Sequence, residues 1–349
     1  MGAVFSEEAH EDNRKFALAQ SGLQLDTAED VAEGVSKLLE RKDDVLEVVL
    51  SKNSYGVEAC ASVRDALSQC VNLQIANLSD IFTGRVKSIL NPALRNLAEG
   101  LLPCRELVEL DLSDNAFGPD GVRAFSFLIE ASPQLKILKV NNNGLGIEGG
   151  TLLAESIGRC EGMQLNVFSA GRNRLEDQGT REISRVLKRM GSLKQISLYQ
   201  NGIREEGMIA LFDAFESNLE LQIIEIQDNL LNKEQVYTAL ASALSKLQFI
   251  SILNIGDSNL KDEGARAVLN SISQTSPHLL ELHMEFNELE ERATANLIIE
   301  MLPSKPQLER VNLKGNEFDE ETRQALADAF EGAEKPDALD DFDSEEEEG

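Results

Sequence analysis

Hydrophobic residues recur along this chain in one short pattern, in which apolar and polar positions alternate just before an asparagine. In residues 107–117 (LVELDLSDNAF) the apolar residues occupy positions one, four, six and eleven, and asparagine occupies position nine. The central alternation predicts a short strand with two side chains turned inward and one outward. A stretch of about 15 residues with helical spacing follows, so each copy predicts a strand, a turn and a helix. Further copies lie at 193–203, 221–231, 279–289 and 308–318, with looser ones around Asn53, Asn143 and Asn173.

The asparagine position returns with one period through most of the chain. It falls at residues 53, 81, 115, 143, 173, 201, 229, 258, 287 and 316, so the gaps are 28, 34, 28, 30, 28, 28, 29, 29 and 29 residues. Units of this kind stack side by side, because none can bury its apolar face alone. The period is typical of the long leucine-rich repeat of the ribonuclease-inhibitor type, with about 28–29 residues per repeat. It predicts an α/β solenoid, a horseshoe with an inner parallel sheet and outer helices.

We expect three segments along the chain. Residues 1–21 form an N-terminal extension, which we expect to be mobile, and residues 22–333 form the leucine-rich-repeat domain with a cap and ten repeats. The cap is predicted as one more strand and helix over 22–41, with a helix N-cap near Thr27, and the last helix is predicted over 319–330. Residues 334–349 contain nine acidic residues and one basic residue. We expect them to form a disordered acidic tail that folding does not need, because such a run repels itself.

Composition and charge narrow the class of partner. The chain has 349 residues, of which 42% are hydrophobic, and a net charge of −28. This charge argues against a nucleic acid as the ligand and favours a basic protein. Neither an apolar run long enough to cross a membrane nor a signal-peptide pattern occurs, and the four cysteines are widely spaced. We therefore expect a cytoplasmic monomer with buried free thiols, without a cofactor or a metal.

Residues that carry chemistry are few. The chain has three histidines, and none of the patterns HExxH, GxSxG or the P-loop occurs. We therefore do not expect it to be an enzyme in its own right. Residues 144–149 (GLGIEG) match the glycine pattern of dinucleotide-binding loops, but their place directly after Asn143 favours a turn of the repeat. The N-terminal MGAVFS fits a myristoylation pattern and leaves open whether Gly2 is modified. The acidic residues that follow argue against stable membrane anchoring.

The residue before each asparagine position is predicted to lie where a strand ends, at one edge of the sheet. Ligands of parallel sheets commonly bind at that edge. We call these ten positions the rim residues. They are Lys52, Asp80, Asp114, Asn142, Arg172, Gln200, Asp228, Asp257, Phe286 and Gly315.

The second repeat departs most from the pattern. Its asparagine position holds Ile81, the next gap is 34 residues, and the inserted sequence includes FTGRVK at 82–87, with Arg85 and Lys87. A loop with a glycine and two cations in an acidic protein is a candidate binding loop. A tolerated insertion with solvated charges explains the same residues equally well. We expect the loop to lie outside the packed repeats, so that Arg85→Ala changes stability by no more than about 0.5 kcal/mol.

Cations and amides of neighbouring repeats lie near this loop along the rim. Strands of a sheet are about 4.8 Å apart, so the second to fifth repeats span roughly 15 Å. Arg85, Asn142 and Arg174 are therefore predicted to reach one face of a partner. Alternatively, these side chains are ordinary polar groups of the surface, with Arg172 or Arg174 paired to neighbouring acidic residues.

Several of these segments match more than the repeat requires. They are SDIFTGRVK (79–87), LSDNAFGPDGV (112–122), NNNGLG (141–146), AGRNRLE (170–176) and YQNGIR (199–204). The chain resembles the Ran GTPase-activating protein family over residues 20–349. The resemblance implies that Arg85 takes the place of the family's key arginine and that Asn142 contacts Ran near its nucleotide. Arg174 corresponds to the second arginine of the GRNR motif and Lys87 to a basic position. We add the rim residues Asp114 and Arg172 as candidate contacts.

The resemblance also implies an activity and a mode of action. It implies stimulation of GTP hydrolysis by Ran in its GTP-bound form, in support of nucleocytoplasmic transport, by a cytoplasmic or perinuclear protein. A GTPase is accelerated by orienting the attacking water and by stabilising charge on the transferred phosphoryl group. An arginine inserted in trans is one route. The family's mode implies another, in which the activator orders Ran's own glutamine and Arg85 supports the interface.

A second class of function fits the same repeat. An acidic leucine-rich-repeat scaffold or inhibitor that clasps a basic protein would need no GTPase activation. Such inhibitors are expected to use aromatic hot spots, whereas this chain has no tryptophan and three tyrosines. The large C-terminal domain of animal members and the N-terminal targeting domain of plant members have no counterpart here. We therefore expect the compact fungal arrangement or a truncated chain.

Overall fold

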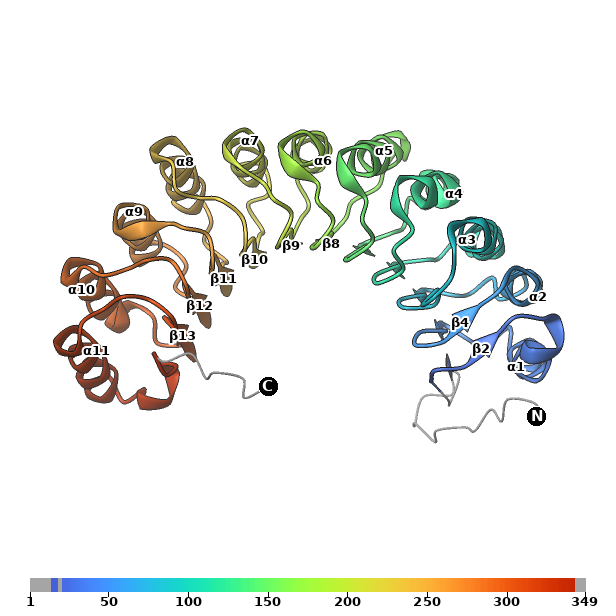
Figure 1. Ribbon diagram of the computed structural model, residues 1–349, viewed down its shortest axis with the longest axis horizontal. Helices are drawn as coiled ribbons and strands as arrows, with labels where there is room; N and C mark the ends of the chain where they lie inside the picture. The colour runs from blue at the N-terminus through green and yellow to red at the C-terminus, as the bar shows by residue number, and fades with distance from the viewer. Residues whose placement is uncertain (1–13, 18–20, 343–349) are drawn as a thin grey trace. The chain divides into compact units, whose positions relative to one another are not determined.

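The structure is a computed structural model that describes residues 14–17 and 21–342. The chain divides into two compact units, the N-terminal unit up to Asn173 and the C-terminal unit from Arg174. In each unit the strands form one layer and the helices form a second layer against one face of the strands (Figure 1). The predicted leucine-rich-repeat solenoid of the ribonuclease-inhibitor type is confirmed, and its repeats are distributed over both units.

The N-terminal unit alternates short strands with helices. Strands β1, β3, β5, β6, β7 and β8 pair in that order and run parallel, while β2 and β4 pair separately. The strands are β1 (Lys15–Ala17), β2 (Gln24–Leu25), β3 (Glu47–Val49), β4 (Ser54–Tyr55), β5 (Ile75–Asn77), β6 (Glu109–Asp111), β7 (Ile137–Lys139) and β8 (Val167–Ser169). The helices are α1 (Ala28–Glu40), α2 (Val57–Leu67), α3 (Lys87–Leu101), α4 (Gly118–Glu130) and α5 (Gly146–Arg159).

The C-terminal unit repeats the same alternation. Its strands pair in chain order and are parallel: β9 (Gln195–Ser197), β10 (Ile223–Glu225), β11 (Ile252–Asn254), β12 (Glu281–His283) and β13 (Arg310–Asn312). The helices are α6 (Glu176–Met190), α7 (Glu205–Phe215), α8 (Glu234–Leu244), α9 (Lys261–Gln274), α10 (Arg292–Met301) and α11 (Glu320–Gly332), with the 3-10 turns η1 (Leu302–Ser304) and η2 (Pro336–Ala338).

The asparagines of the repeat hold neighbouring strands together through buried hydrogen bonds. Asn143 is fully buried. Its Oδ1 accepts from the backbone N–H of Asn115 at 3.0 Å, and its Nδ2 donates to the carbonyls of Leu112 at 2.9 Å and Val140 at 3.0 Å. One side chain thus satisfies backbone groups of two repeats, which would otherwise be buried without partners. This bonding explains why the pattern requires an asparagine at that position.

The rim residues share one backbone conformation. All ten have a positive φ, from 46° at Asp257 to 67° at Gly315. This left-handed conformation turns the chain out of the strand, so that the backbone N–H of one rim residue can bond the next repeat. The N–H of Asn142 donates to the Gly171 carbonyl at 2.8 Å, for example. The predicted register of the ten repeats is therefore confirmed.

The N-terminal extension differs from the prediction. Residues 15–17, expected to be mobile, form strand β1, which pairs in parallel with β3 and buries Phe16. The predicted cap is confirmed, since β2 and α1 follow and the Thr27 hydroxyl accepts from the N–H of Asp30. Residues 1–13 and 18–20 of the predicted extension lie outside the described residues.

The predicted start of the disordered acidic tail, at residue 334, is also wrong. Residues 334–342 fold against the last repeat: η2 buries Ala338, Leu339 bridges to Val311, and Asp340 pairs with Arg310 at 2.8 Å. The carbonyl of Phe342 accepts from the N–H of Gly315 at 3.0 Å. The segment covers the open edge of β13, a need that charge composition alone does not reveal. Residues 343–349 of the predicted tail lie outside the described residues.

Candidate functional site

The inserted loop of the second repeat is anchored at both ends. Phe82 is buried at its start, and the N–H of Arg85 donates to the Phe82 carbonyl at 3.0 Å, which closes a turn through Gly84 at φ 76°. Val86 is 61% exposed and caps α3, so the loop presents an apolar side chain beside Lys87. The insertion is therefore an ordered turn that projects a small mixed surface.

Arg85 lies folded back on the N-terminal cap and is only 10% exposed. Its Nε donates to the Ser54 hydroxyl at 2.9 Å, its Nη2 donates to the Ser54 carbonyl at 2.8 Å, and its Nη1 pairs with Asp26. The expectation that this side chain lies outside the packed repeats is wrong. The insertion places Arg85 against β4 of the first repeat, where Ser54 supplies both acceptors, and beside Asp26 of the cap, which supplies the counter-charge. Removing the guanidinium therefore affects the fold as well as the surface.

Lys87, Asp114 and Asn142 lie on neighbouring repeats of the N-terminal unit, and all three are exposed. The Nδ2 of Asn142 donates to the Asp114 Oδ1 at 2.9 Å, which orients the asparagine amide across the rim. Lys87 is the first residue of α3, and its Nζ lies 3.9 Å from where a β-carbon would stand on Gly118. The structure thus brings Asp114 and Asn142 together and extends Lys87 toward the start of α4.

The two predicted arginines of the AGRNRLE segment lie on either side of the boundary between the units. Arg172 is the last rim residue of the N-terminal unit, with φ 56°, and Arg174 is the first residue of the C-terminal unit, also with φ 56°. Both are exposed. Within the described part of the chain neither makes an ion pair, so the alternative that they pair with neighbouring acidic residues is not supported.

Asp26, Ser54 and Val86 belong to the same surface but were not among the predicted site residues. Asp26 and Ser54 are 59 and 31 residues from Arg85 in the chain. No sequence spacing indicates such contacts, since they depend on how the cap and the first repeat pack beside the loop of the second repeat. Val86 stands inside the quoted FTGRVK sequence, and its exposure as an apolar residue would have required the turn geometry to be known.

This surface offers hydrogen-bond donors, the carboxylates of Asp26 and Asp114, and an exposed apolar residue, Val86. A group of that kind can recognise a partner and orient it. Among the described residues there is no cluster of three side chains suited to a metal ion, and no helix of residues 14–17 and 21–342 is long and apolar enough to cross a membrane. The cysteines are buried as predicted.

Fold and repeat define the class of protein. A family model described as leucine-rich repeat matches residues 104–126. The crystal structure of an internalin from Listeria monocytogenes is similar with a TM-score of 0.50 at 17% identity, over 93% of this chain and 86% of that one. The chain is thus a leucine-rich-repeat protein. The similarity to the internalin supports the fold alone.

Sequence relatives narrow the class to a family. Ran GTPase-activating protein 1 of Saccharomyces cerevisiae is 30% identical over 81% of this chain and 72% of the relative. The chain belongs to the Ran GTPase-activating protein family. Ran GTPase-activating protein 1 of Xenopus laevis is 40% identical over 52% of this chain, and the match spans 33% of that longer protein. The resemblance noted in the sequence is therefore confirmed.

Proposed function

We propose that this chain activates the GTPase Ran, binds it in its GTP-bound form and thereby supports nucleocytoplasmic transport from the cytoplasm. Membership of the family supports the activity. The observation that carries it is the rim of the N-terminal unit, where Asp114 orients Asn142, and where Lys87 at the end of the Arg85 loop and Arg172 on the fifth repeat stand exposed. A monomer suffices for this role, since one chain supplies all the proposed contacts.

The proposed division of labour follows from the contacts. Arg85 is held by Ser54 and Asp26, so it acts as a fixed element of the interface and does not extend as a free finger. Asn142 presents an oriented amide, and Lys87, Arg172 and Arg174 supply positive charge on an otherwise acidic chain. Hydrolysis then uses Ran's own groups, while this chain orders them. Positioning and charge stabilisation are sufficient for phosphoryl transfer, because the reaction needs no covalent intermediate.

Hydrolysis with a catalytic amount of the chain tests the proposal. Ran loaded with radiolabelled GTP is mixed with a hundredth of its molar amount of the intact chain, and phosphate release is followed over time. We expect acceleration of at least about 10³-fold over Ran alone, with every Ran molecule turned over. A second GTPase of the same superfamily serves as the specificity control and is expected to hydrolyse at its basal rate.

Binding measured in parallel separates the two classes of function. If the chain binds Ran loaded with a non-hydrolysable GTP analogue and leaves hydrolysis unchanged, it is a scaffold or inhibitor and the activator proposal is wrong. If it neither binds nor accelerates, Ran is not its partner. Stimulation that requires this chain in stoichiometric amounts would also contradict a catalytic activator.

A further inference from the structure

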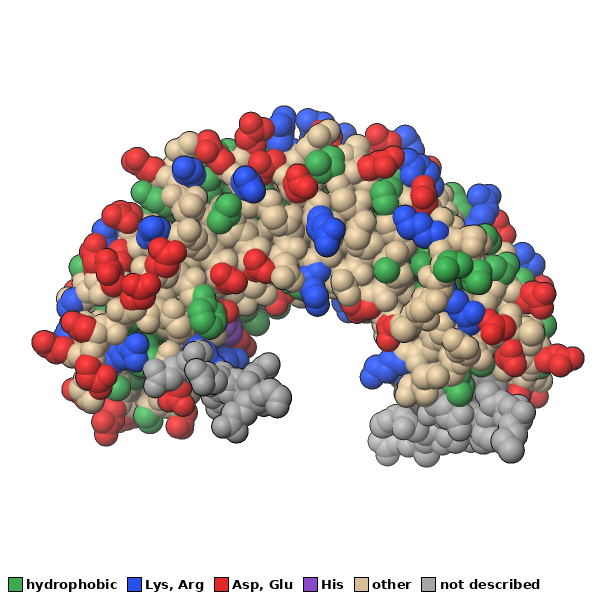
Figure 2. Space-filling view, in the orientation of Figure 1, with side chains coloured by type: hydrophobic (Ala, Val, Ile, Leu, Met, Phe, Trp, Pro, Cys, Tyr) green, Lys and Arg blue, Asp and Glu red, His purple; other side chains and the backbone are tan. Residues whose placement is uncertain are grey.

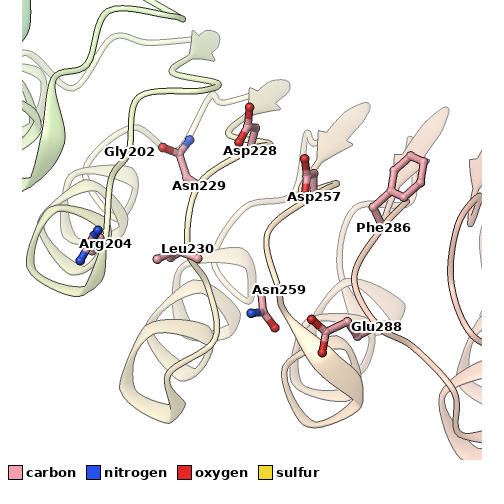
Figure 3. A pocket seen from close by; sticks show the side chains of 9 residues that line it. All are labelled: Gly202, Arg204, Asp228, Asn229, Leu230, Asp257, Asn259, Phe286 and Glu288. Carbon is pink, nitrogen blue, oxygen red and sulfur yellow. The ribbon is translucent and has the colours of Figure 1, made fainter.

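The rim of the C-terminal unit lines an open hollow of about 390 Å³, which the proposed activator function does not use. This volume lies within the range of ligand-binding sites. Asp228, Asp257 and Phe286 stand side by side where β10, β11 and β12 end, and Leu230, Asn259 and Glu288 form a second row on the side of the helices (Figure 3). We call these six residues the C-terminal rim surface. Gly202, Arg204 and Asn229 complete the lining.

Phe286 is an unusual residue for its position. It is 47% exposed and has a φ of 51°, a conformation that is unfavourable for a bulky side chain. Its ring is braced by the next rim position, because a β-carbon on Gly315 would lie 2.2 Å from the Phe286 Cε1. The ring is thus held in place while half of it faces solvent. A bulky side chain that is held in a strained conformation and still leaves half of its surface exposed indicates a contact made with another molecule.

The carboxylates beside Phe286 are not fully compensated. Burial, and then the charge of Asp257, raises the pKa of Asp228 above its usual value. Glu288 pairs with Lys261 at 3.2 Å, and both of these side chains are half exposed, while Arg204 is the cation that lines the hollow. Asp257 makes no ion pair with any described residue. Neither Asp228 nor Asp257 therefore forms an ion pair with a described residue, although the Gln200 side chain forms a hydrogen bond with Asp228. Figure 2 shows red acidic side chains gathered over this part of the chain.

Asn259 gives independent evidence that the hollow lacks a hydrogen-bond donor. It lines the same hollow, and its Oδ1 is shielded from solvent without a hydrogen-bond donor among the described residues. A buried acceptor without a donor is destabilising. A ligand rich in N–H groups, admitted by a small rotation of this side chain, would satisfy it.

We propose that the C-terminal rim surface binds an arginine-bearing segment of a protein partner. A guanidinium is planar, weakly hydrated and rich in donors, so it can stack on the Phe286 ring while it donates to Asp228 and Asp257. A lysine ammonium would satisfy the charge but would gain less from the ring and reach fewer acceptors. Exposed Leu230 accommodates an apolar neighbour in the segment. The surface is independent of GTPase activation, because none of the residues proposed for that role belongs to it.

Two fluorescein-labelled peptides of equal length and charge test the proposal, GRGSRGSRG and GKGSKGSKG. Their binding to the intact chain is measured by fluorescence anisotropy at about 0.1 M salt. We expect the arginine peptide to bind at least about threefold more tightly than the lysine peptide, in keeping with the advantage of a stacked guanidinium. Phe286→Ala is expected to remove this preference.

Two double variants of equal net charge distinguish binding at the C-terminal rim surface from attraction by the net negative charge of the whole chain. Asp228→Asn with Asp257→Asn removes two carboxylates from the hollow, and we expect the arginine peptide to bind about tenfold more weakly. Glu220→Gln with Glu309→Gln removes two exposed carboxylates at the opposite strand ends of the same unit, and we expect less than about a twofold change. Melting curves establish that each variant is folded.

Three results would overturn the proposal. Equal binding of the two peptides, or an equal loss in the two double variants, means that the peptides respond only to the net charge of −28. Unchanged binding by Phe286→Ala means that the ring is not a contact. The absence of measurable binding means that the surface does not recognise arginine. None of these results bears on Ran hydrolysis, which is assayed separately.

Discussion

The two units carry the same rim on the same backbone but treat their rim side chains differently. In the N-terminal unit the polar groups are oriented by neighbours: Ser54 and Asp26 hold Arg85, and Asp114 holds Asn142. In the C-terminal unit Asp228 and Asp257 repel each other, and an exposed Phe286 stands in a strained conformation. The repeat therefore determines the position of each rim side chain. The neighbouring residues determine whether its hydrogen-bonding and charged groups already have partners within the chain.

The largest effect is expected at Arg85. Arg85→Ala removes a charged side chain from an ordered interface, and we expect kcat/KM for Ran stimulation to fall at least about 30-fold, equal to about 2 kcal/mol. The unfolding free energy should fall by about 1–2 kcal/mol, because Ser54 and Asp26 lose their partner. Hydrolysis assays and urea melts measure the two effects. A variant that stimulates normally would remove Arg85 from the site.

Arg85→Lys and Asp26→Asn sharpen this result. Lysine keeps the charge but cannot donate to Ser54 and Asp26 together, so a variant with full activity would show that charge alone matters. Asp26 is 56% exposed, and its pairing is worth at most about 1 kcal/mol. We therefore expect Asp26→Asn to raise KM by no more than about fivefold and to leave kcat unchanged.

Two truncations test whether residues 334–342 stabilise the edge of β13. A chain that ends at Ala333 loses η2, the Leu339 bridge and the contact of Asp340 with Arg310, whereas a chain that ends at Phe342 keeps them. We expect the shorter chain to lose about 2 kcal/mol of unfolding free energy, since it exposes the edge of β13 and leaves backbone groups without partners. Equal melting temperatures for the two chains would show that the segment contributes nothing to the fold.

The adjacent residues Asn142 and Asn143 test whether the proposed binding site can be separated from the structural repeat. Asn143→Ala leaves the backbone groups of Asn115, Leu112 and Val140 without partners, and we expect a loss of about 1–3 kcal/mol in stability. Asn142→Ala should cost less than about 0.5 kcal/mol in stability, because the side chain is exposed, while it lowers Ran stimulation. Thermal melts and hydrolysis assays that gave the reverse pattern would mean that the rim assignment of the fourth repeat is incorrect.

The smallest effect is expected at Asp228. Because its pKa is raised in the folded state, the charged carboxylate opposes folding above its unfolded pKa near 3.8 and not below it. Asp228→Asn should therefore raise the melting temperature slightly at about pH 7 and leave it unchanged at about pH 3. A lower melting temperature for Asp228→Asn at neutral pH would show that the carboxylate is already compensated.

The amino-acid sequence by itself determined the repeat, its register, the cap helix and the place of all ten rim residues. It could do so because each repeat must bury its apolar positions with one period, and because the turn after each strand returns with that period. The same local matches identified the family and Arg85, Asn142 and Lys87 as candidate site residues.

Only the tertiary structure decided which of these side chains are engaged. Arg85 meets Ser54 of the first repeat and Asp26 of the cap because these elements lie beside the loop of the second repeat. Residues 334–342 fold because β13 has an edge to cover. The exposed ring of Phe286 depends on the absent β-carbon of Gly315. Such contacts join residues far apart in the chain, and their energies depend on distance in space, which no local pattern of residues records.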